Sequence, residues 1–151
     1  MAEFRRITAD MTEQYVRMAT DFYASPAVLT PIPQEHMRAT AELCISGSPF
    51  ADLYLFYEQE EAIGYGLLAH TFSQEAGGSV VWIEEIYILP AHRKKGIGSS
   101  FLEFVRATYP AARFRLETEP ENERAQALYR RLGFSPIGYI GFVSDVPDRK
   151  L

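Results

Sequence analysis

The chain has 151 residues and a mass of 17.1 kDa, a length typical of one domain, and 47% hydrophobic with 23% charged residues is a globular composition. Its apolar stretches are far shorter than the roughly 20 residues of a membrane span, and its first residues lack the apolar core of a secretory signal. Cys44, the single cysteine, excludes an internal disulfide, and the three histidines lack the spacing of metal ligands. We expect a soluble, cytoplasmic, single-domain protein over residues 1–151, with no metal and no membrane partner.

Charge is distributed unevenly along the chain, although the net charge is only −5. Residues 1–89 contain four basic and thirteen acidic side chains, whereas residues 90–151 contain eleven basic and seven acidic ones. A globally basic nucleic-acid-binding protein is therefore disfavoured, because binding to the phosphate backbone needs a large positive field. The asymmetry suits one anionic and one cationic ligand, and a simple drift of charge along the chain is the alternative.

The first third of the chain predicts a strand and two helices. Phe4–Thr8 reads as a strand, and Asp10 with an acid three residues later has the form of a helix start. This helix is expected to run to about Ala24. Prolines then interrupt the chain before a second helix over Gln34–Ile45. The buried face of the first helix is expected to contain Tyr15, Met18, Ala19, Phe22 and Tyr23.

The middle of the chain predicts three consecutive strands. Asp52–Tyr57 is apolar on both alternate faces, as expected of a strand covered on both sides. Ala62–Phe72 and Val80–Leu89 follow, separated by short turns. Pro90 ends the third strand because proline cannot donate a hydrogen bond to a sheet.

The last third predicts two helices and two more strands. Apolar residues at helical spacing begin at Ile97, and Ala112–Glu117 alternates arginines with apolar residues, as in a strand with one wet face. Asn122 is a helix cap, and Gly133 is the expected left-handed stop. Ser135–Val143 reads as a last strand. The order β-α-α-β-β-β-α-β-α-β predicts an α/β fold, a mixed sheet with helices on both faces.

The segment between the third strand of the middle group and the next helix is the most informative one. Gly96 and Gly98 allow backbone N–H groups to approach a ligand closely, and the helix start favours an anion, most simply a phosphate. Three cations precede these glycines: Arg93, Lys94 and Lys95. The spacing fits neither a Walker loop nor a dinucleotide fingerprint. An ordinary helix N-terminus with solvated lysines is the alternative.

Three motifs in the right order make the sequence resemble the GNAT superfamily of N-acetyltransferases. Residues 93–98, Arg-Lys-Lys-Gly-Ile-Gly, fit that family's Arg/Gln-x-x-Gly-x-Gly/Ala loop. Residues 83–90 fit the strand before the loop, and residues 122–134 fit the helix after it. The match covers residues 80–134, and its strand motif is most similar to those of polyamine and small-amine acetyltransferases.

The resemblance implies a GNAT fold that binds acetyl-CoA in a V-shaped opening between the fourth and fifth strands. Its cofactor-binding residues would be Ile86, Tyr87, Ile88, Arg93, Lys94, Lys95, Gly96, Ile97, Gly98, Ser99 and Asn122. N–H groups from Lys94 to Ser99 would hold the pyrophosphate. The strand backbone would pair with the pantetheine arm, and one amide, most plausibly that of Ile86, would polarise the thioester carbonyl.

The resemblance also implies catalytic groups for two proton transfers. An amine acceptor with a pKa near 10 must lose a proton before it attacks. Glu84 or Glu85 would take that proton, and the resemblance favours Glu84; the two lie on opposite faces of the strand unless a bulge intervenes. Tyr129 would protonate the departing thiolate, although a core aromatic is the competing interpretation.

The sequence therefore predicts direct transfer of acetyl from acetyl-CoA to a primary amine of a small molecule or peptide. We expect the acceptor to contact the acidic N-terminal half, including the loop Pro26–Pro33 and the aromatics Tyr23 and Phe72. Cys44 is interpreted as a small buried residue and not as an acetyl carrier. The alternatives are a non-catalytic acyl-CoA-binding module and an interaction domain whose last strand pairs with a second subunit, which would make a homodimer.

Overall fold

The computed structural model describes residues 1–147 and contains two compact units, Met1–Glu117 and Thr118–Leu151. The first unit contains a five-stranded sheet with three helices, and the second contains one helix. Within residues 1–147, no helix is both long and apolar enough to cross a membrane. The two units are described in turn.

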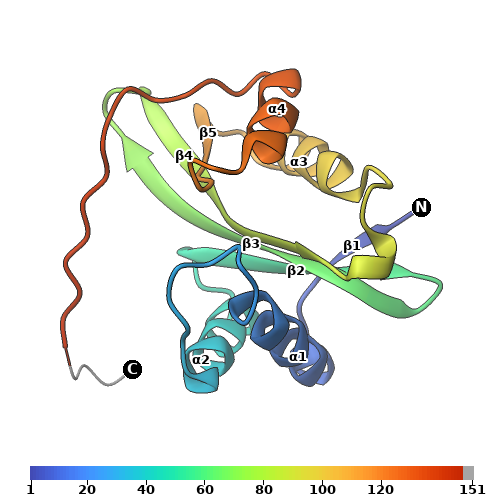
Figure 1. Cartoon of the computed structure of the whole chain (residues 1–151). Coiled ribbons are helices and arrows are strands. Elements are labelled where there is room, and N and C mark those ends of the chain that lie inside the picture. The colour runs from blue at the N-terminus through green and yellow to red at the C-terminus, as the bar shows by residue number, and fades with distance from the viewer. Residues whose placement is uncertain (148–151) are drawn as a thin grey trace. The chain divides into compact units, whose positions relative to one another are not determined.

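The sheet of the first unit follows chain order, β1-β2-β3-β4-β5 (Figure 1). Its strands are β1 Glu3–Arg6, β2 Ala51–Glu58, β3 Glu61–Ser73, β4 Gly78–Ile88 and β5 Arg113–Leu116. The pairs up to β3–β4 are antiparallel, whereas β4 and β5 are parallel and are joined over the four residues Val80–Ile83 only. The sheet is therefore mixed, as the sequence predicts.

Helices cover both faces of this sheet. α1 (Thr12–Tyr23) and α2 (Gln34–Ile45) pack on one face, and α3 (Ile97–Thr108) packs on the other (Figure 1). The predicted start of the first helix is wrong in detail. A 3-10 turn over Ala9–Met11 precedes α1, and the Asp10 side chain accepts a hydrogen bond from the Thr8 hydroxyl and does not cap the helix. The Asp10 side-chain oxygen that the capping motif would need therefore accepts a hydrogen bond from the Thr8 hydroxyl in the local turn instead.

Each face of the sheet has its own apolar core. The core between the sheet and α1–α2 includes Tyr15, Met18, Ala19, Leu53, Leu55, Tyr57, Tyr65 and Tyr87, and Phe22 and Tyr23 pack against it. This confirms the buried face that helical spacing predicts for α1. The core under α3 is aromatic and consists of Phe4, Tyr54, Phe56, Phe101 and Phe104, with ring centroids 4.7–6.1 Å apart. The sheet is thus held between two layers.

In the second unit, α4 (Glu123–Arg131) begins at Asn122, whose Oδ1 accepts a hydrogen bond of 3.1 Å from the Ala125 N–H. Gly133 has φ +88° and ends the helix, as predicted. The predicted strand over Ser135–Val143 is wrong, because residues 135–146 form neither helix nor strand. A strand needs a neighbour for its backbone groups, and none pairs with this segment in the described chain. The mixed α/β class is confirmed without it.

Close packing between β3 and α3 requires glycine at position 66. A Cβ atom on Gly66 would lie 2.3 Å from the Phe101 ring, which is fully buried in the aromatic core. We expect Gly66→Ala to lower the free energy of unfolding by about 1–3 kcal/mol, the usual cost of overpacking a core. Urea denaturation measures this difference. Gly138→Ala is the matched control, since its Cβ would meet nothing within 4 Å, and equal stability of the two variants would contradict the packing argument.

Candidate functional site

A β-bulge in β4 places two glutamates beside each other. Leu67 of β3 lies opposite Glu85 and Leu68 lies opposite Ile83, so Glu84 is an extra residue without a partner in the ladder. The extra residue cancels the usual alternation of side chains, and the charges of Glu84 and Glu85 act on each other. The sequence places Glu84 and Glu85 on opposite faces of the strand unless a bulge intervenes, and the structure contains that bulge.

Glu85 is held by two tyrosine hydroxyls on the side of the sheet covered by α1. Tyr65 donates to its Oε1 at 2.7 Å, and Tyr23, at the end of α1, donates to its Oε2. Burial and the neighbouring Glu85 charge raise the pKa of both tyrosines, so both hydroxyls keep the protons they donate. Both oxygens of Glu85 are thus occupied by protein donors.

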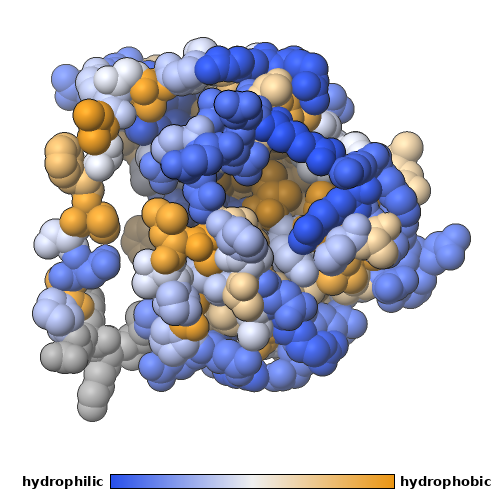
Figure 2. All heavy atoms as spheres, in the orientation of Figure 1, coloured by the Kyte–Doolittle hydropathy of each residue, from blue (hydrophilic) through white to orange (hydrophobic). Residues whose placement is uncertain are grey.

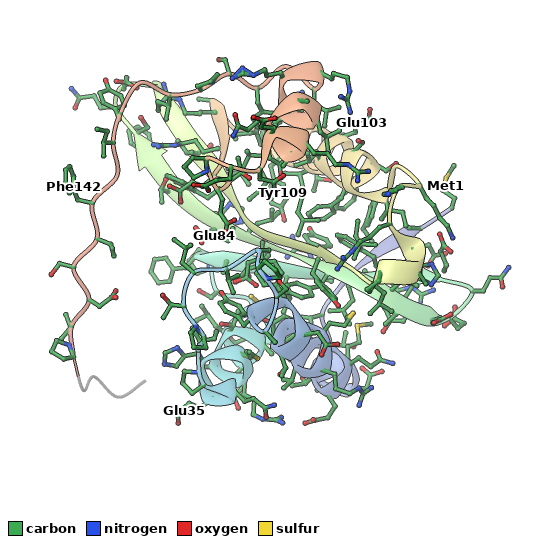
Figure 3. All side chains as sticks on the ribbon, in the orientation of Figure 1. Met1, Glu35, Glu84, Glu103, Tyr109 and Phe142 are labelled. Atoms are coloured by element: carbon green, nitrogen blue, oxygen red, sulfur yellow. The ribbon has the colours of Figure 1, made fainter. Side chains whose placement is uncertain are left out.

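Glu84 has a different environment. Glu84 is exposed as a whole residue, but its carboxyl group is partly surrounded by protein. This partial burial raises the pKa of Glu84, and the negative charges of Glu85 and Glu117 raise it further. Within residues 1–147, no side chain donates a hydrogen bond to it. Figure 3 labels Glu84 on β4, on the side of the sheet where α1 and α2 lie. A carboxylate with a raised pKa and free lone pairs is suited to accept a proton.

Beyond the bulge, β4 separates from β5. The last β5 partner in β4 is Ile83, so Ile86, Tyr87 and Ile88 follow where β4 has no neighbour on that side among the described strands. The Tyr87 side chain is buried beside the Phe22 and Tyr65 rings. The backbone edge of this stretch can therefore pair with an extended ligand, as in strand addition.

The loop after β4 ends in an open helix N-terminus. Arg93 donates from Nε to the Ile88 carbonyl at 2.7 Å, and its guanidinium lies 5.5 Å from the centre of the Tyr87 ring. Lys94 and Gly96 have φ values of +64° and +79°, which turn the chain into α3. The first N–H groups of α3 have no partner in the helix, and its first turn contains no acidic side chain.

Space for a ligand remains at both loop glycines. A Cβ on Gly96 would meet nothing within 4 Å, and one on Gly98 would meet only Ile88 Cδ1 at 3.8 Å. Lys94 and Lys95 are exposed beside them, and Ser99 follows in the first turn of the helix. Unpaired N–H groups, the positive end of the helix dipole and two free cations together suit a phosphate group.

The remaining titratable candidates lie apart from the glutamates. Burial raises the pKa of the Cys44 thiol to about 11, which fits a small packed residue and not a nucleophile. His70 hydrogen-bonds Asp52 at 2.9 Å, and the Nδ1 atom of His92 lies 3.5 Å from a Glu58 oxygen.

A cavity of about 520 Å³ between α1 and the β2–β3 turn contains neither glutamate. It is lined by residues such as Arg17, Asp21 and Glu61, and only its Leu89 adjoins the loop after β4. Its lining mixes both signs of charge, and it does not contribute to the arrangement around the bulge.

Asn122 and Tyr129 belong to the second unit. Asn122 caps α4, as the sequence predicts. The Tyr129 ring lies 6.1 Å from that of Phe134, and the Tyr129 carbonyl accepts a hydrogen bond from the Phe134 N–H. Burial raises the pKa of Tyr129, so its hydroxyl is protonated at neutral pH. That is the state a proton donor needs.

Sequence reasoning missed Tyr65 and misplaced Phe72. Tyr65 reads as a core aromatic, and only the strand register brings its hydroxyl to Glu85. Phe72 lies opposite Ser79 near the far end of the β3–β4 hairpin, about 17 Å along β3 from Leu67, the residue opposite Glu85. Tyr23, by contrast, donates a hydrogen bond to Glu85, and its contact with an acceptor stays a prediction.

The sequence matches the family described as "Acetyltransferase (GNAT) family" over residues 12–134, which is most of the chain. The chain belongs to this family. Both units contribute to the matched region, which includes the loop after β4 and α4. This confirms the resemblance that the three motifs carry.

The chain is also similar to individual proteins of known sequence. It is 34% identical to the thialysine N-epsilon-acetyltransferase of Mus musculus over 87 residues, 53% of this chain and 51% of that protein. The chain thus spans about half the length of the curated relatives it matches first. It is 28% identical to the uncharacterized N-acetyltransferase YhfO of Bacillus subtilis over 61% of this chain and 64% of that one.

Among solved structures, a possible acetyltransferase from Clostridium difficile 630 superposes with a TM-score of 0.79 at 15% identity, covering 97% of this chain and 98% of that one. The aminoglycoside N-acetyltransferase AAC(6')-Iy, solved with a bisubstrate analogue of CoA, gives 0.79 at 18% identity, with 97% and 99% covered. These likenesses show the GNAT fold. In the described residues, no group of three or more His, Cys, Asp or Glu side chains is placed to hold a metal ion.

The two tyrosines that donate to Glu85 differ in burial, and this difference predicts which hydroxyl contributes more to stability. Tyr65 is fully buried and Tyr23 only partly, so loss of the Tyr65 hydroxyl leaves the carboxylate with less access to water. We expect Tyr65→Phe to lower the free energy of unfolding by about 1–3 kcal/mol and Tyr23→Phe by less. Urea denaturation of both variants tests this. A Tyr23→Phe variant that is the less stable of the two would show that burial does not govern the cost.

Proposed function

We propose that the protein is an acetyl-CoA-dependent N-acetyltransferase that moves the acetyl group directly to a primary amine of a small cationic molecule. The observation that carries the proposal is the sequence of features along β4 and its loop. A carboxylate pair stands at a bulge, an unpaired backbone edge follows, and an anion-binding helix start comes next. A thioester at the end of a pantetheine arm with a pyrophosphate needs these features in this order.

The residues of the first unit fit coenzyme A. The N–H groups around Gly96 and Gly98 would hold the pyrophosphate in the space that a Cβ would otherwise fill, with Lys94 and Lys95 adding positive charge. Arg93 would hold the loop through the Ile88 carbonyl. The open edge at Ile86–Ile88 would pair with the pantetheine amides. Coenzyme A then supplies the activated acetyl group.

The two glutamates would divide the work at the acceptor amine. Glu84, with its raised pKa and no protein donor, would take the proton from the ammonium group, directly or through a water. Glu85, whose oxygens accept from Tyr23 and Tyr65, would stay in place as fixed negative charge near the amine. The neutral amine then attacks the thioester carbon, whose oxygen the Ile86 amide would stabilise.

Two residues of the second unit complete the proposal through the family resemblance. The C–S bond breaks as the C–N bond forms, and Tyr129 would give its proton to the leaving thiolate. The second proton of the amine nitrogen would then leave to water, from which Tyr129 regains its proton. Asn122 would hydrogen-bond the pantetheine while capping α4. The match to the family covers both residues, which supports their assignment and that of residues 1–151 as one functional domain.

The acceptor is proposed to be a small molecule with a primary amine at the end of a flexible chain. The charges of Glu85 and Glu117 both act on Glu84, and these three carboxylates of the first unit would attract a cation. The name of the mouse relative, thialysine N-epsilon-acetyltransferase, describes such an amine. A peptide lysine presents the same group and is the competing acceptor. A reducing, cytoplasmic location suits the single cysteine.

A substitution at Gly98 tests ligand binding without disturbing the fold. Added bulk there meets only Ile88 Cδ1, so we expect Gly98→Leu to weaken acetyl-CoA binding at least tenfold while the melting temperature changes little. Calorimetric titration with acetyl-CoA and a thermal melt measure the two effects. Ser100→Leu, at an exposed position two residues later, is the matched control and should bind normally. If Gly98→Leu bound acetyl-CoA as tightly as the wild type, the loop would not be part of the acetyl-CoA site.

The raised pKa of Glu84 makes a prediction about pH. A base must be ionised, so kcat should rise with pH through a pKa above the usual 4.5 of glutamate. We expect Glu84→Gln to lower kcat by about 10²–10⁴-fold and to lose this acid limb. Release of free CoA thiol across a panel of diamines and lysine analogues measures kcat. Glu103→Gln, an exposed change on α3, is the control.

The same assay tests the other roles. Tyr129→Phe should reduce kcat more than acetyl-CoA affinity, and an unchanged kcat would refute the proton donor. If the protein bound acetyl-CoA but released no thiol with any amine, it would be a non-catalytic acyl-CoA-binding module and not an enzyme.

A further inference from the structure

His92 contains a buried nitrogen that makes no hydrogen bond within the described chain. The residue ends the 3-10 turn over Pro90–His92, directly before the cationic loop. Its side chain is only 18% exposed, and its Nδ1 atom has no hydrogen-bond partner among residues 1–147. Its charged neighbour is Glu58, the last residue of β2, whose Oε2 lies 3.5 Å from Nδ1. Buried polar atoms usually have a partner, so this arrangement requires an explanation.

The carboxylate of Glu58 determines which ring nitrogen of His92 carries the proton. A bare Nδ1 would turn its lone pair toward the negative oxygens, whereas an Nδ1–H group is attracted by them. On this ground we assign a proton to Nδ1, in the neutral as well as in the charged ring. The contact is therefore attractive, although it is somewhat longer than a full hydrogen bond.

The two segments that meet at this contact have strained backbone. Gln59 and Glu60, which follow Glu58 in the β2–β3 turn, have φ values of +46° and +66°, and Lys94, two residues after His92, has +64°. Within residues 1–147, these three are the residues other than glycine with a positive φ. A left-handed backbone is unfavourable for residues with a Cβ and persists only where the surrounding structure holds it in place.

The β2–β3 turn is held firmly on its own side of the contact. Arg5 of β1 donates to both carboxylate oxygens of Glu60, at 2.8 and 3.2 Å. Glu58 precedes this turn and lies opposite Glu61 in the ladder between β2 and β3. The sheet therefore presents the Glu58 carboxylate from a fixed position.

The loop after β4 has few other fixed points. Its last hydrogen bond to β3 runs from the Leu89 N–H to the Ile63 carbonyl, at 2.8 Å. In the described chain, the other hydrogen bonds of residues 90–95 stay within the segment 87–93. Figure 1 shows both turns at the end of the sheet where β4 leads into α3, and Figure 2 shows hydrophilic residues on the surface there. His92 thus joins the loop to a strand that is distant in the sequence.

We propose that the contact between His92 and Glu58 anchors the loop in the conformation that receives acetyl-CoA, which makes His92 a positioning residue for cofactor binding. The inference rests on the proposed function, because it places acetyl-CoA at this loop. When the loop is held in advance, its N–H groups lose little freedom as the pyrophosphate binds, and less binding free energy is used to order them. The anchor therefore acts on affinity and not on turnover of the bound complex.

A ring of similar size separates the contact from simple packing. His92→Phe keeps an aromatic ring but removes the Nδ1–H group. We expect it to weaken acetyl-CoA binding roughly tenfold in calorimetric titration, with kcat at saturating acetyl-CoA and KM for the amine unchanged. His92→Asn should recover part of the affinity, because its amide N–H replaces the lost donor. His36→Phe, at an exposed histidine of α2, is the matched control and should bind normally. Equal weakening by His92→Phe and His92→Asn would overturn the role of the donor.

A double-mutant cycle tests whether the two side chains act together. Glu58→Met, which keeps the length of the side chain without its charge, should also weaken acetyl-CoA binding roughly tenfold. The double variant with His92→Phe should lose about tenfold and not a hundredfold, because both changes remove the same contact. A hundredfold loss would mean independent roles and overturn the anchor. Glu61→Met, at the exposed residue opposite Glu58, is the control.

Hydrogen exchange tests the anchor in the free protein. The amides of Leu89, His92 and Arg93 are hydrogen-bonded in the loop and should exchange roughly threefold or more faster in His92→Phe than in the wild type. Circular dichroism confirms that each variant is folded.

The two measurements distinguish failure of the anchor from failure of the proposed function. A wild type that bound no acetyl-CoA would refute the proposed function, and faster exchange in His92→Phe would still support an anchored loop. A wild type that bound acetyl-CoA, with His92→Phe binding as tightly and exchanging as slowly, would overturn the anchor alone.

Discussion

The site depends on a single extra residue in β4. Glu84 has no partner in β3, and at the same point the pairing of β4 with β5 ends. A regular strand would send the side chains of adjacent residues to opposite faces of the sheet. The bulge instead brings two carboxylates together, and the four residues of β5 end before the next stretch of β4. The proposed base and the proposed ligand-binding edge therefore follow each other along β4.

Two neighbouring glutamates acquire different properties because different elements surround them. α1 and β3 bring tyrosine hydroxyls to Glu85, which satisfies its oxygens and holds it in one position. Glu84 receives no such donor within the described chain and is affected mainly by burial and by nearby negative charge, which raise its pKa. The surroundings, and not the residue type, therefore distinguish the two glutamates.

The short β5 has consequences on both of its sides. Toward β4, its four residues end before the bulge and open the space next to Ile86–Ile88. On its outer side, β5 is the last strand of the sheet among the described residues 1–147. The first opening is where we propose that coenzyme A binds.

The sequence by itself determined the local features. Glycine and proline positions, apolar spacing and the motif around Gly96 and Gly98 predict most elements and the anion-binding loop, because these signals depend on neighbouring residues alone. Only the tertiary structure decided that Tyr65 reaches Glu85, that a bulge occurs at Glu84, and that Ser135–Val143 forms no strand within the described chain. Strand register and strand partners join residues far apart in the chain, and no local pattern records which distant edge is free to pair.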